Sequence, residues 1–259
     1  MSTIQFRSVL ALLLLSSACG TQQGVPPPAP PPQVIVAPHD GAPVQAPLAP
    51  KSRTLNANEL AQMGFQIPGN QAQWDSLPPQ PGQQVQGLTV KGGPGADTNW
   101  TAFTLILFAN NKGGYEVLTQ KRTIKPSGVI ETPGGHLTGG QSWRTGAVTE
   151  IQQESGIKLH ESDLFYLEGG KLGVSKATGK LYGNVNFFAV FTGAKPTTAV
   201  TSHEVDASYG HQWLPLEQIY TDAKTEQAQA GFNQGKYYSF FRQQLISFVE
   251  NVLNKKFSH

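Results

Sequence analysis

The sequence predicts an α/β domain in its C-terminal part, and three observations indicate this fold class. Residues 101–122 contain two short β-rich segments separated by a turn. A glycine-rich bend and a helical segment follow at residues 133–155. Further apolar segments at residues 164–167 and 184–191 have the composition of strands. Strands that alternate with a helix are typical of a sheet covered by helices.

The first two strands are expected to pair and to lead into the glycine bend. Residues 103–108 form a short apolar strand, and residues 110–114, Asn-Asn-Lys-Gly-Gly, form a turn. Residues 115–122 alternate between apolar and polar side chains, as a half-buried strand does. Gly134 and Gly135 come just before the helix and have no side chain, so they allow the backbone to approach a metal ion or a phosphate.

A helix is expected between Ser142 and Gly156, since Ser142 can cap its start and Gly156 suits a left-handed C-terminal residue. Glu150 and Glu154 are four residues apart and project from one face, with Gln153 beside them. Two carboxylates at this spacing repel by roughly a few tenths of a kcal/mol. A Mg²⁺ ion would relieve that repulsion, because it prefers oxygen ligands and keeps several waters. The alternative interpretation is a solvated acidic helix face.

The segment from Gly135 to Ile157 resembles the signature of the Nudix family, Mg²⁺-dependent hydrolases of nucleoside diphosphates linked to another group. The positions that match are Gly135, Glu150, Ile151, Glu154, Gly156 and Ile157. The positions that depart from the signature are Gln141, Thr149 and Gln153. The resemblance implies an α/β/α sandwich with a mixed sheet, which we assign to residues 95–259.

The resemblance also implies the catalytic metal site. Glu150 and Glu154 would be catalytic residues that hold Mg²⁺ or Mn²⁺, and Gln153 would be a third, weaker ligand because an amide oxygen is uncharged. Thr149 replaces an arginine that orients the glutamates in relatives. The loss of such support typically costs about 10- to 100-fold in affinity or activity. A slow enzyme and an inactive one are both consistent with these substitutions.

The substrate and the general base are implied less directly. Arg122, Gly134 and Gly135 would bind the substrate, although Arg122 can also be a charge at the end of a surface strand. Residues 212–219 resemble the family's strand that leads into a short helix, and family members often carry a general base or extra ligand in the loop before it. The candidates there are His203, Glu204, Asp206 and His211. Glu204 is our first choice as a catalytic residue, and ordinary polar loop residues are the alternative.

The N-terminus predicts export. Arg7 is followed by an apolar segment at residues 9–15 that is too short to span a membrane, and then by Ser-Ser-Ala-Cys. This layout resembles a bacterial lipoprotein signal, with residues 1–18 as the signal peptide and Cys19 as the lipidation site, although Ser16 stands where Leu is usual. Gly20 resembles the sorting signal of outer-membrane lipoproteins. We therefore expect a lipid-anchored protein of the bacterial cell envelope. Because Cys19 is the only cysteine, no disulfide can stabilise the domain.

Residues 19–52 are rich in proline and alanine, which favours an extended linker that lifts the domain from the membrane. A ligand for a proline-binding domain is the alternative. Residues 53–94 form an N-terminal extension with a short helix expected at residues 58–64. The apolar residues of the extension that are expected to pack against the domain are Trp74, Leu77, Leu88 and Val90.

Residues 236–257 carry apolar side chains at helical spacing, which indicates a helix that covers the sheet as part of the core. The alternatives are a helix that lies on a membrane or one that fits a partner's groove. The members of this apolar stripe are Tyr238, Phe241, Leu245, Phe248, Val249 and Val252.

Charge composition narrows the choice of partners. Charged residues make up 14% of the chain and the net charge is +2, without a block of like charges, so we expect no nucleic-acid partner. We expect an exported hydrolase that cleaves a diphosphate linkage in a nucleotide-derived substrate. The alternatives are an impaired Nudix-fold module that binds a ligand or partner, and a structural protein of the envelope.

Overall fold

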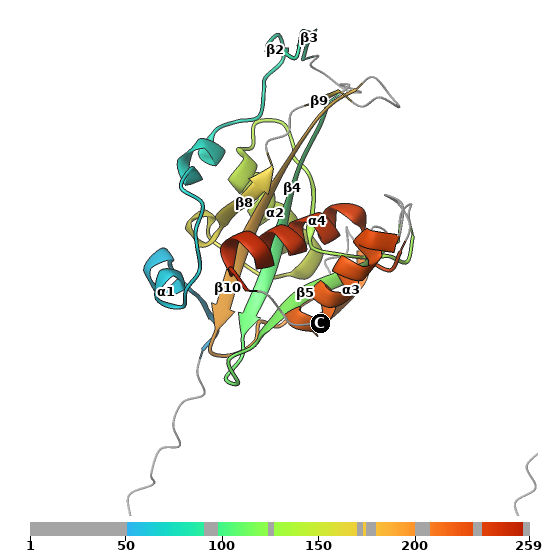
Figure 1. Ribbon diagram of the computed structural model, residues 1–259. Helices are drawn as coiled ribbons and strands as arrows, with labels where there is room; N and C mark the ends of the chain where they lie inside the picture. The colour runs from blue at the N-terminus through green and yellow to red at the C-terminus, as the bar shows by residue number, and fades with distance from the viewer. Residues whose placement is uncertain are drawn as a thin grey trace, which may run out of the picture. The chain divides into compact units, whose positions relative to one another are not determined.

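A mixed β-sheet forms the centre of the part of the chain that the computed structural model describes (Figure 1). The described residues are 51–90, 98–123, 127–169, 173–174, 180–199, 208–229 and 235–255. The main path of the sheet is β1 (Arg53–Thr54), β10 (Leu181–Thr192), β4 (Thr98–Ala109), β5 (Tyr115–Arg122) and β11 (Ser208–Pro215). The additional strands are β6 (Ile130–Glu131), β7 (Gly134–His136), β8 (Phe165–Gly169) and β9 (Gly173–Val174).

The sheet is mixed because its two longest strands, β10 and β4, run parallel. Leu181 lies opposite Thr98, and the register continues to Phe191 opposite Phe108. The other pairings of the sheet among the described residues are antiparallel. Parallel strands in the middle of a sheet need cover on both faces, which explains why β4 and β10 are apolar on both faces.

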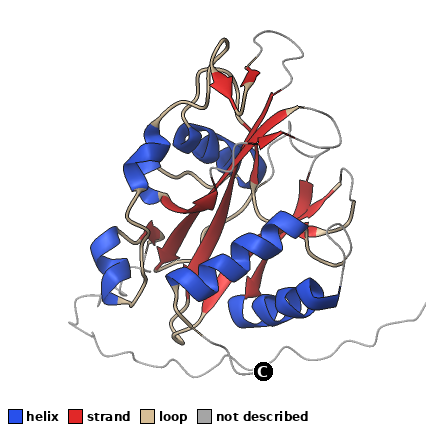
Figure 2. Cartoon of the chain, turned by 45° about the horizontal axis from the view of Figure 1, so that its top comes forward, coloured by secondary structure: helices blue, strands red, loops and turns tan. Residues whose placement is uncertain are grey.

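Helices cover both faces of the sheet (Figures 1 and 2). On one face, α2 (Trp143–Ser155) packs through Trp143, Ala147 and Ile151 against residues such as Ile106. The opposite face contacts α3 (Leu216–Gln229), α4 (Ser239–Ser247) and the π-helical turn η3 (Phe248–Val252). Consecutive residues of β4 alternate between the two core clusters, as strand geometry requires. The α/β/α fold with a mixed sheet is therefore confirmed.

The C-terminal stripe belongs to the core, as predicted. Its buried members, all in one cluster with the sheet, are Phe241, Leu245, Phe248, Val249 and Val252. Tyr238 is partly buried against the same cluster. Among the helices of the described residues, none has the length and apolarity needed to cross a bilayer.

The extension is built into the domain. β1 pairs with the edge of β10, and α1 (Ala57–Gln62) follows with a capping box formed by Asn56 and Glu59. Leu60 and Phe65 are buried in the core, where Phe65 stacks near Phe188 at 6.4 Å between ring centroids. Phe65 thus adds to the aromatic contacts that Phe165 and Phe248 also make with Phe188.

A 3₁₀ turn, η1 (Gln71–Asp75), continues the extension toward α2. Trp74 stacks on Tyr166 with 4.8 Å between ring centroids, and Val90 is buried in a small cluster beyond the hairpin of β2 (Gln84–Val85) and β3 (Leu88–Thr89). The packing predicted for Trp74 and Val90 is confirmed. The same prediction was wrong for Leu77 and Leu88, which are 49% and 40% exposed. A lone apolar residue in an irregular segment does not reveal which way it faces.

Several element boundaries differ from the prediction. The strand expected at residues 103–108 extends over Thr98–Ala109, because its partner β10 continues beside it. The residues after β11 form α3 (Leu216–Gln229), a helix of 14 residues. The expected glycine loop contains a short strand, β7, in which Gly134 pairs with Phe103 of β4.

Candidate active site

Helix α2 has the ends that the sequence predicts. Ser142 is the N-cap, and its side chain accepts a hydrogen bond of 3.0 Å from the backbone N–H of Thr145. Gly156 ends the helix with φ at 71°, a left-handed conformation that glycine adopts at little cost. A Cβ at Gly156 would lie 2.7 Å from the carbonyl oxygen of Ala199. These two ends fix which residues of α2 face the sheet.

Glu154 lies on the buried side of α2, with only 5% of its surface exposed. Its Oε2 atom accepts a hydrogen bond of 2.6 Å from the backbone N–H of Gly134 and one of 3.0 Å from Nε2 of Gln120. Gln120 is buried in β5, whereas Gly134 begins β7. The carboxylate of Glu154 therefore connects the helix with two strands of the sheet.

The pKa of Glu154 is raised to about 8. Burial is the main cause, because it penalises the charged form. The hydrogen bonds from Gly134 and Gln120 act in the opposite direction, while the charges of Glu131 and Glu150 raise the pKa further. Glu154 thus lies in a region of concentrated negative charge, where a bound cation would favour its ionised form.

Glu150 lies one turn earlier and contacts the same bend. A Cβ added to Gly135 would overlap the carboxylate of Glu150, so only glycine leaves room for this side chain in its present position. A Cβ at Gly134 would lie 2.5 Å from the carbonyl oxygen of Ala102. The two glycines therefore allow β7 to approach both β4 and the two glutamates.

Arg122 and Glu131 form a second charged group beside Glu154. Nη1 of Arg122 lies 2.7 Å from Oε2 of Glu131, which is 3% exposed. The guanidinium also lies over the ring of Tyr238, at 4.7 Å from its centroid. Arg122 is thus positioned by two contacts, and it lies close enough to His136 for its charge to lower the pKa of that side chain, after the larger effect of burial.

The residues that depart from the family signature lie in different surroundings. Gln153 is exposed on α2. Thr149 donates a hydrogen bond of 2.9 Å to the carbonyl of Thr145 within the helix and accepts one of 3.2 Å from Nε2 of Gln141. Thr149 is therefore bonded to its own helix and to Gln141, and neither bond reaches Glu150 or Glu154.

Of the candidates for a general base, Glu204 lies outside the described residues, as do His203 and Asp206. His211 is described and lies in β11, next to the end of α2. Burial lowers the pKa of His211, and a hydrogen bond with the backbone of Glu154 acts in the opposite direction. His211 is the one of these four that the described structure brings to the glutamates.

Two functional candidates were missed in the sequence. Glu131 precedes the glycine bend in Ile-Glu-Thr-Pro-Gly-Gly. Gln120 lies in β5, where residues 117–120 are all buried, so the predicted alternation of this strand was wrong. The signal for Glu131 is its position just before the glycine bend, whereas Gln120 reaches the site because β5 pairs with β6, with Gln120 opposite Glu131.

The donor set suits Mg²⁺ bound through a small number of protein ligands. Glu150 and Glu154 offer two carboxylates beside the bend, and their mutual repulsion favours a cation. Mg²⁺ is commonly held by one or two carboxylates together with substrate phosphates and water. Within the described part of the chain, no three His, Cys, Asp or Glu side chains are arranged as a complete metal-binding group. These residues therefore fit a site that a substrate would help to complete.

A family model described as the NUDIX domain matches residues 98–234, which is more than half of the chain. The chain belongs to the Nudix family. The match covers α2, the glycine bend and the central strands, and it ends before α4. A comparison with curated protein sequences gave no match.

Solved Nudix structures resemble the chain at low identity. The Nudix domain of NrtR from Shewanella oneidensis, solved with ADP ribose, is 13% identical over 59% of this chain and 87% of that one, with a TM-score of 0.44. An Ap4A hydrolase from C. elegans is 18% identical over 58% and 95%, with a TM-score of 0.41. A MutT/nudix family protein from Enterococcus faecalis is 17% identical over 50% and 47%, with a TM-score of 0.39, so the match spans about half of that protein.

Proposed function

We propose that this protein is a divalent-metal-dependent hydrolase that cleaves a diphosphate linkage in a nucleotide-derived substrate. The observation that carries the proposal is the placement of Glu150 and Glu154 against the Gly134–Gly135 bend in a member of the Nudix family. The two glutamates come from one helix, and both contact the same short strand. Such a placement suits a cation and a phosphate that share one site.

Charge and burial support a cation at this site. Glu154 is buried, and the carboxylates of Glu131 and Glu150 raise its pKa, so ionisation of all three without a counter-charge is costly. Arg122 neutralises Glu131 through their ion pair. A divalent ion between Glu150 and Glu154 would compensate the remaining charge.

Each residue then has a distinct role. Glu150 and Glu154 would hold Mg²⁺ or Mn²⁺, which supplies charge neutralisation for the diphosphate and a more acidic water. Gln120 and the N–H of Gly134 orient Glu154 through their hydrogen bonds. Arg122 would bind substrate phosphate through the guanidinium N–H groups that its ion pair with Glu131 does not use. The general base would come from the loop that includes Glu204.

The proposal predicts slow turnover. Gln153 supplies no charge where relatives have a carboxylate, and Thr149 bonds to its own helix and to Gln141 rather than to the glutamates. Each loss weakens metal binding, and the loss of a positioned base costs about 10² to 10⁴ in rate.

The test is Mg²⁺- or Mn²⁺-dependent release of products from ADP-ribose and from dinucleoside polyphosphates. We expect weak activity that Glu150→Gln and Glu154→Gln abolish and Gln153→Glu increases. Glu217→Gln on α3 is the matched control, because Glu217 is exposed and lies outside the site. The proposal fails if neither the wild type nor Gln153→Glu turns over and calorimetry detects no binding of either metal.

A second candidate is a Nudix-fold module that binds a ligand without hydrolysing it. The uncharged Gln153 at a ligand position favours it, since a site with fewer charges can keep a pocket and lose turnover. This candidate predicts that calorimetry detects binding of ADP-ribose while no product accumulates, even in the Gln153→Glu variant.

We also propose that the protein is exported and anchored in the bacterial cell envelope through lipidated Cys19. The support is the signal-like sequence at residues 1–18, which lies outside the described residues. Metabolic labelling with radioactive palmitate should label the wild type and leave Cys19→Ala unlabelled. Equal labelling of the two proteins would contradict the anchor.

A further inference from the structure

The apolar contacts of α2 with the sheet are few for a helix that carries the candidate metal ligands. Among its buried residues, Trp143, Ala147 and Ile151 are apolar. The other buried residues are charged, polar or lack a side chain, namely Arg144, Gly146, Glu154 and Ser155. The apolar stripe is therefore too narrow to hold the helix by itself.

The extension supplies negative charge and a hydrogen-bond acceptor at the start of α2. The helix has no acidic residue in its first turn, where negative charge is favourable. The backbone N–H of Trp143 donates a hydrogen bond of 3.3 Å to the carbonyl of Ser76, and Asp75 brings a carboxylate to the same place. Thr145 donates a hydrogen bond of 2.7 Å to Glu161, which adds a second carboxylate.

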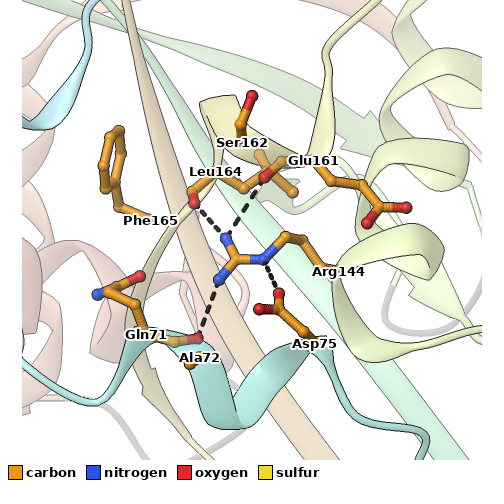
Figure 3. A pocket seen from close by; sticks show the side chains of 8 residues that line it. All are labelled: Gln71, Ala72, Asp75, Arg144, Glu161, Ser162, Leu164 and Phe165. Atoms are coloured by element: carbon orange, nitrogen blue, oxygen red, sulfur yellow. Dashed lines mark hydrogen bonds and ion pairs between the residues drawn. The ribbon is translucent and has the colours of Figure 1, made fainter.

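Arg144 connects α2 to η1 and to the segment before β8 (Figure 3), and it also faces β10. Its Nε atom donates to Asp75 at 2.7 Å and its Nη2 atom donates to the carbonyl of Gln71 at 3.0 Å. Its Nη1 atom donates to the carbonyl of Leu164, just before β8. The guanidinium also lies 5.3 Å from the ring centroid of Phe187 in β10.

These contacts favour a supporting role for Arg144 over binding of an anion. The side chain is 8% exposed, and each of its three nitrogens donates to a protein oxygen. Arginine suits such a position because its planar group stays charged and fixes several acceptors at once. The pocket of about 460 Å³ that it borders is also lined by Asp75 and Glu161, so an anion would meet two carboxylates there.

The 3₁₀ turn η1 is itself held firmly, so it can act as a support. The amide of Gln71 donates to the carbonyl of Tyr166 at 3.2 Å, and the N–H of Tyr166 donates back to Oε1 of Gln71 at 2.6 Å. Trp74 stacks on the same tyrosine and meets the edge of Trp143 at 6.2 Å between ring centroids. η1 is thus fixed to β8 through backbone and aromatic contacts.

We propose that Arg144 is a positioning residue and that η1, which precedes the matched Nudix domain, fixes α2 so that Glu150 and Glu154 stay aimed at the glycine bend. Arg144 and Glu154 are ten residues apart on one helix, which is about 15 Å along its axis. A shift at the start of a continuous helix moves its end, so the bond between Glu154 and Gly134 depends on the anchor. This inference rests on the proposed function for its metal-binding readout.

The test compares Arg144→Ala, Asp75→Ala and Gln71→Ala with Arg242→Ala as a control. Arg242 is also a buried arginine in an ion pair, with Glu226 of α3, and it lies in α4 on the other face of the sheet. We expect Arg144→Ala to weaken Mn²⁺ binding by about 10- to 100-fold at temperatures well below unfolding. Asp75→Ala and Gln71→Ala should weaken it in the same direction, and Arg242→Ala should lower Tm without changing Mn²⁺ affinity.

Hydrogen exchange provides a second readout that needs no metal. Exchange at residues 149–155 should accelerate in Arg144→Ala relative to both the wild type and Arg242→Ala. Equal exchange there, with unchanged Mn²⁺ affinity in Arg144→Ala, Asp75→Ala and Gln71→Ala, overturns the inference. If the wild type binds no metal, the exchange result alone decides this inference, and the proposed function fails if turnover is also absent in the wild type and in Gln153→Glu. If Arg144→Ala does not fold, the same measurements on Asp75→Ala test the inference. The side chain of Asp75 is 60% exposed, so we expect this variant to fold.

Discussion

The backbone N–H of Gly134 donates a hydrogen bond of 2.6 Å to the carboxylate of Glu154, which joins the first residue of β7 to the last turn of α2. The bond favours the ionised carboxylate, whereas burial favours the neutral acid. Burial is the larger effect, since the pKa of Glu154 is raised to about 8. The protonation of Glu154 is therefore set mainly by burial, against the hydrogen bond from Gly134.

The first prediction concerns stability and pH in the absence of metal. The pKa of Glu154 is about 8 in the folded state and 4.5 as a model value, so folding favours the protonated form. The stabilisation is present below the unfolded pKa and is lost as the pH rises toward the folded pKa. At about 1.4 kcal/mol per pKa unit, the loss is on the order of a few kcal/mol. Urea unfolding at a series of pH values measures it.

The matched variant for this prediction is Glu154→Gln, which keeps the shape of the side chain and cannot ionise. Its stability should depend less on pH between about pH 5 and pH 8 than that of the wild type. Identical slopes in the two proteins would show that Glu154 binds the same number of protons in the folded and unfolded states, so that its pKa is not raised by folding.

The second prediction concerns the effect of Mg²⁺ on Tm. A cation binds the ionised site, so Mg²⁺ should raise Tm more at about pH 9 than at about pH 6, where Glu154 is protonated. At a concentration 100 times the Kd, the stabilisation is about 2.7 kcal/mol. Differential scanning calorimetry with and without Mg²⁺ measures the shift. Glu150→Gln and Glu154→Gln should lose it, and a shift that persists in both variants would locate the bound ion elsewhere.

The third prediction concerns Gly135→Ala. The new methyl group would overlap the carboxylate of Glu150, which is the end of a flexible side chain and can turn away. We therefore expect little change in the free energy of unfolding and a clear loss of Mn²⁺ affinity, about 10-fold or more. Gly139→Ala is the control, because a Cβ there meets no atom within 4 Å. If Gly135→Ala binds Mn²⁺ as tightly as Gly139→Ala does, the position of Glu150 is not important for the metal.

The fourth prediction tests whether the extension is part of the folded domain. Phe65 is 4% exposed and lies among the rings of Tyr115, Phe188 and Phe248. Phe65→Ala should lower the free energy of unfolding by about 3–5 kcal/mol, as for other buried aromatic residues. Met63→Ala, two residues earlier and 45% exposed, should change it by less than about 0.5 kcal/mol. Similar unfolding curves for the two variants would mean that the extension detaches before the domain unfolds.

The helix of the candidate site could be predicted because its signals are local. Ser142 and Gly156 set its ends through bonds within a few residues, and the spacing of Glu150 and Glu154 follows from helical geometry. The apolar stripe of α4 and η3 was predictable for the same reason, since periodicity shows which residues share a face. The roles of Glu150, Gln153 and Glu154 as metal ligands stay predictions.

The surroundings of that helix could not be predicted from local signals. Glu131 and Gln120 come from separate strands, and the pairing of β5 with β6 and the position of β7 beside β4 bring them to Glu154. The exposure of Leu77 could not be read either, because an irregular segment has no period that assigns a residue to a face.

The sequence by itself determined the resemblance to the family, which implies the layers of the fold, and the face of α2 that carries two glutamates, which follows from spacing along the chain. Tertiary structure alone decided that Glu154 is buried beside Glu131 and that Arg144 is held by Asp75 of the extension. The physical reason is that burial and charge depend on neighbours distant in sequence, and a helix or strand pattern carries no information about which neighbours those are.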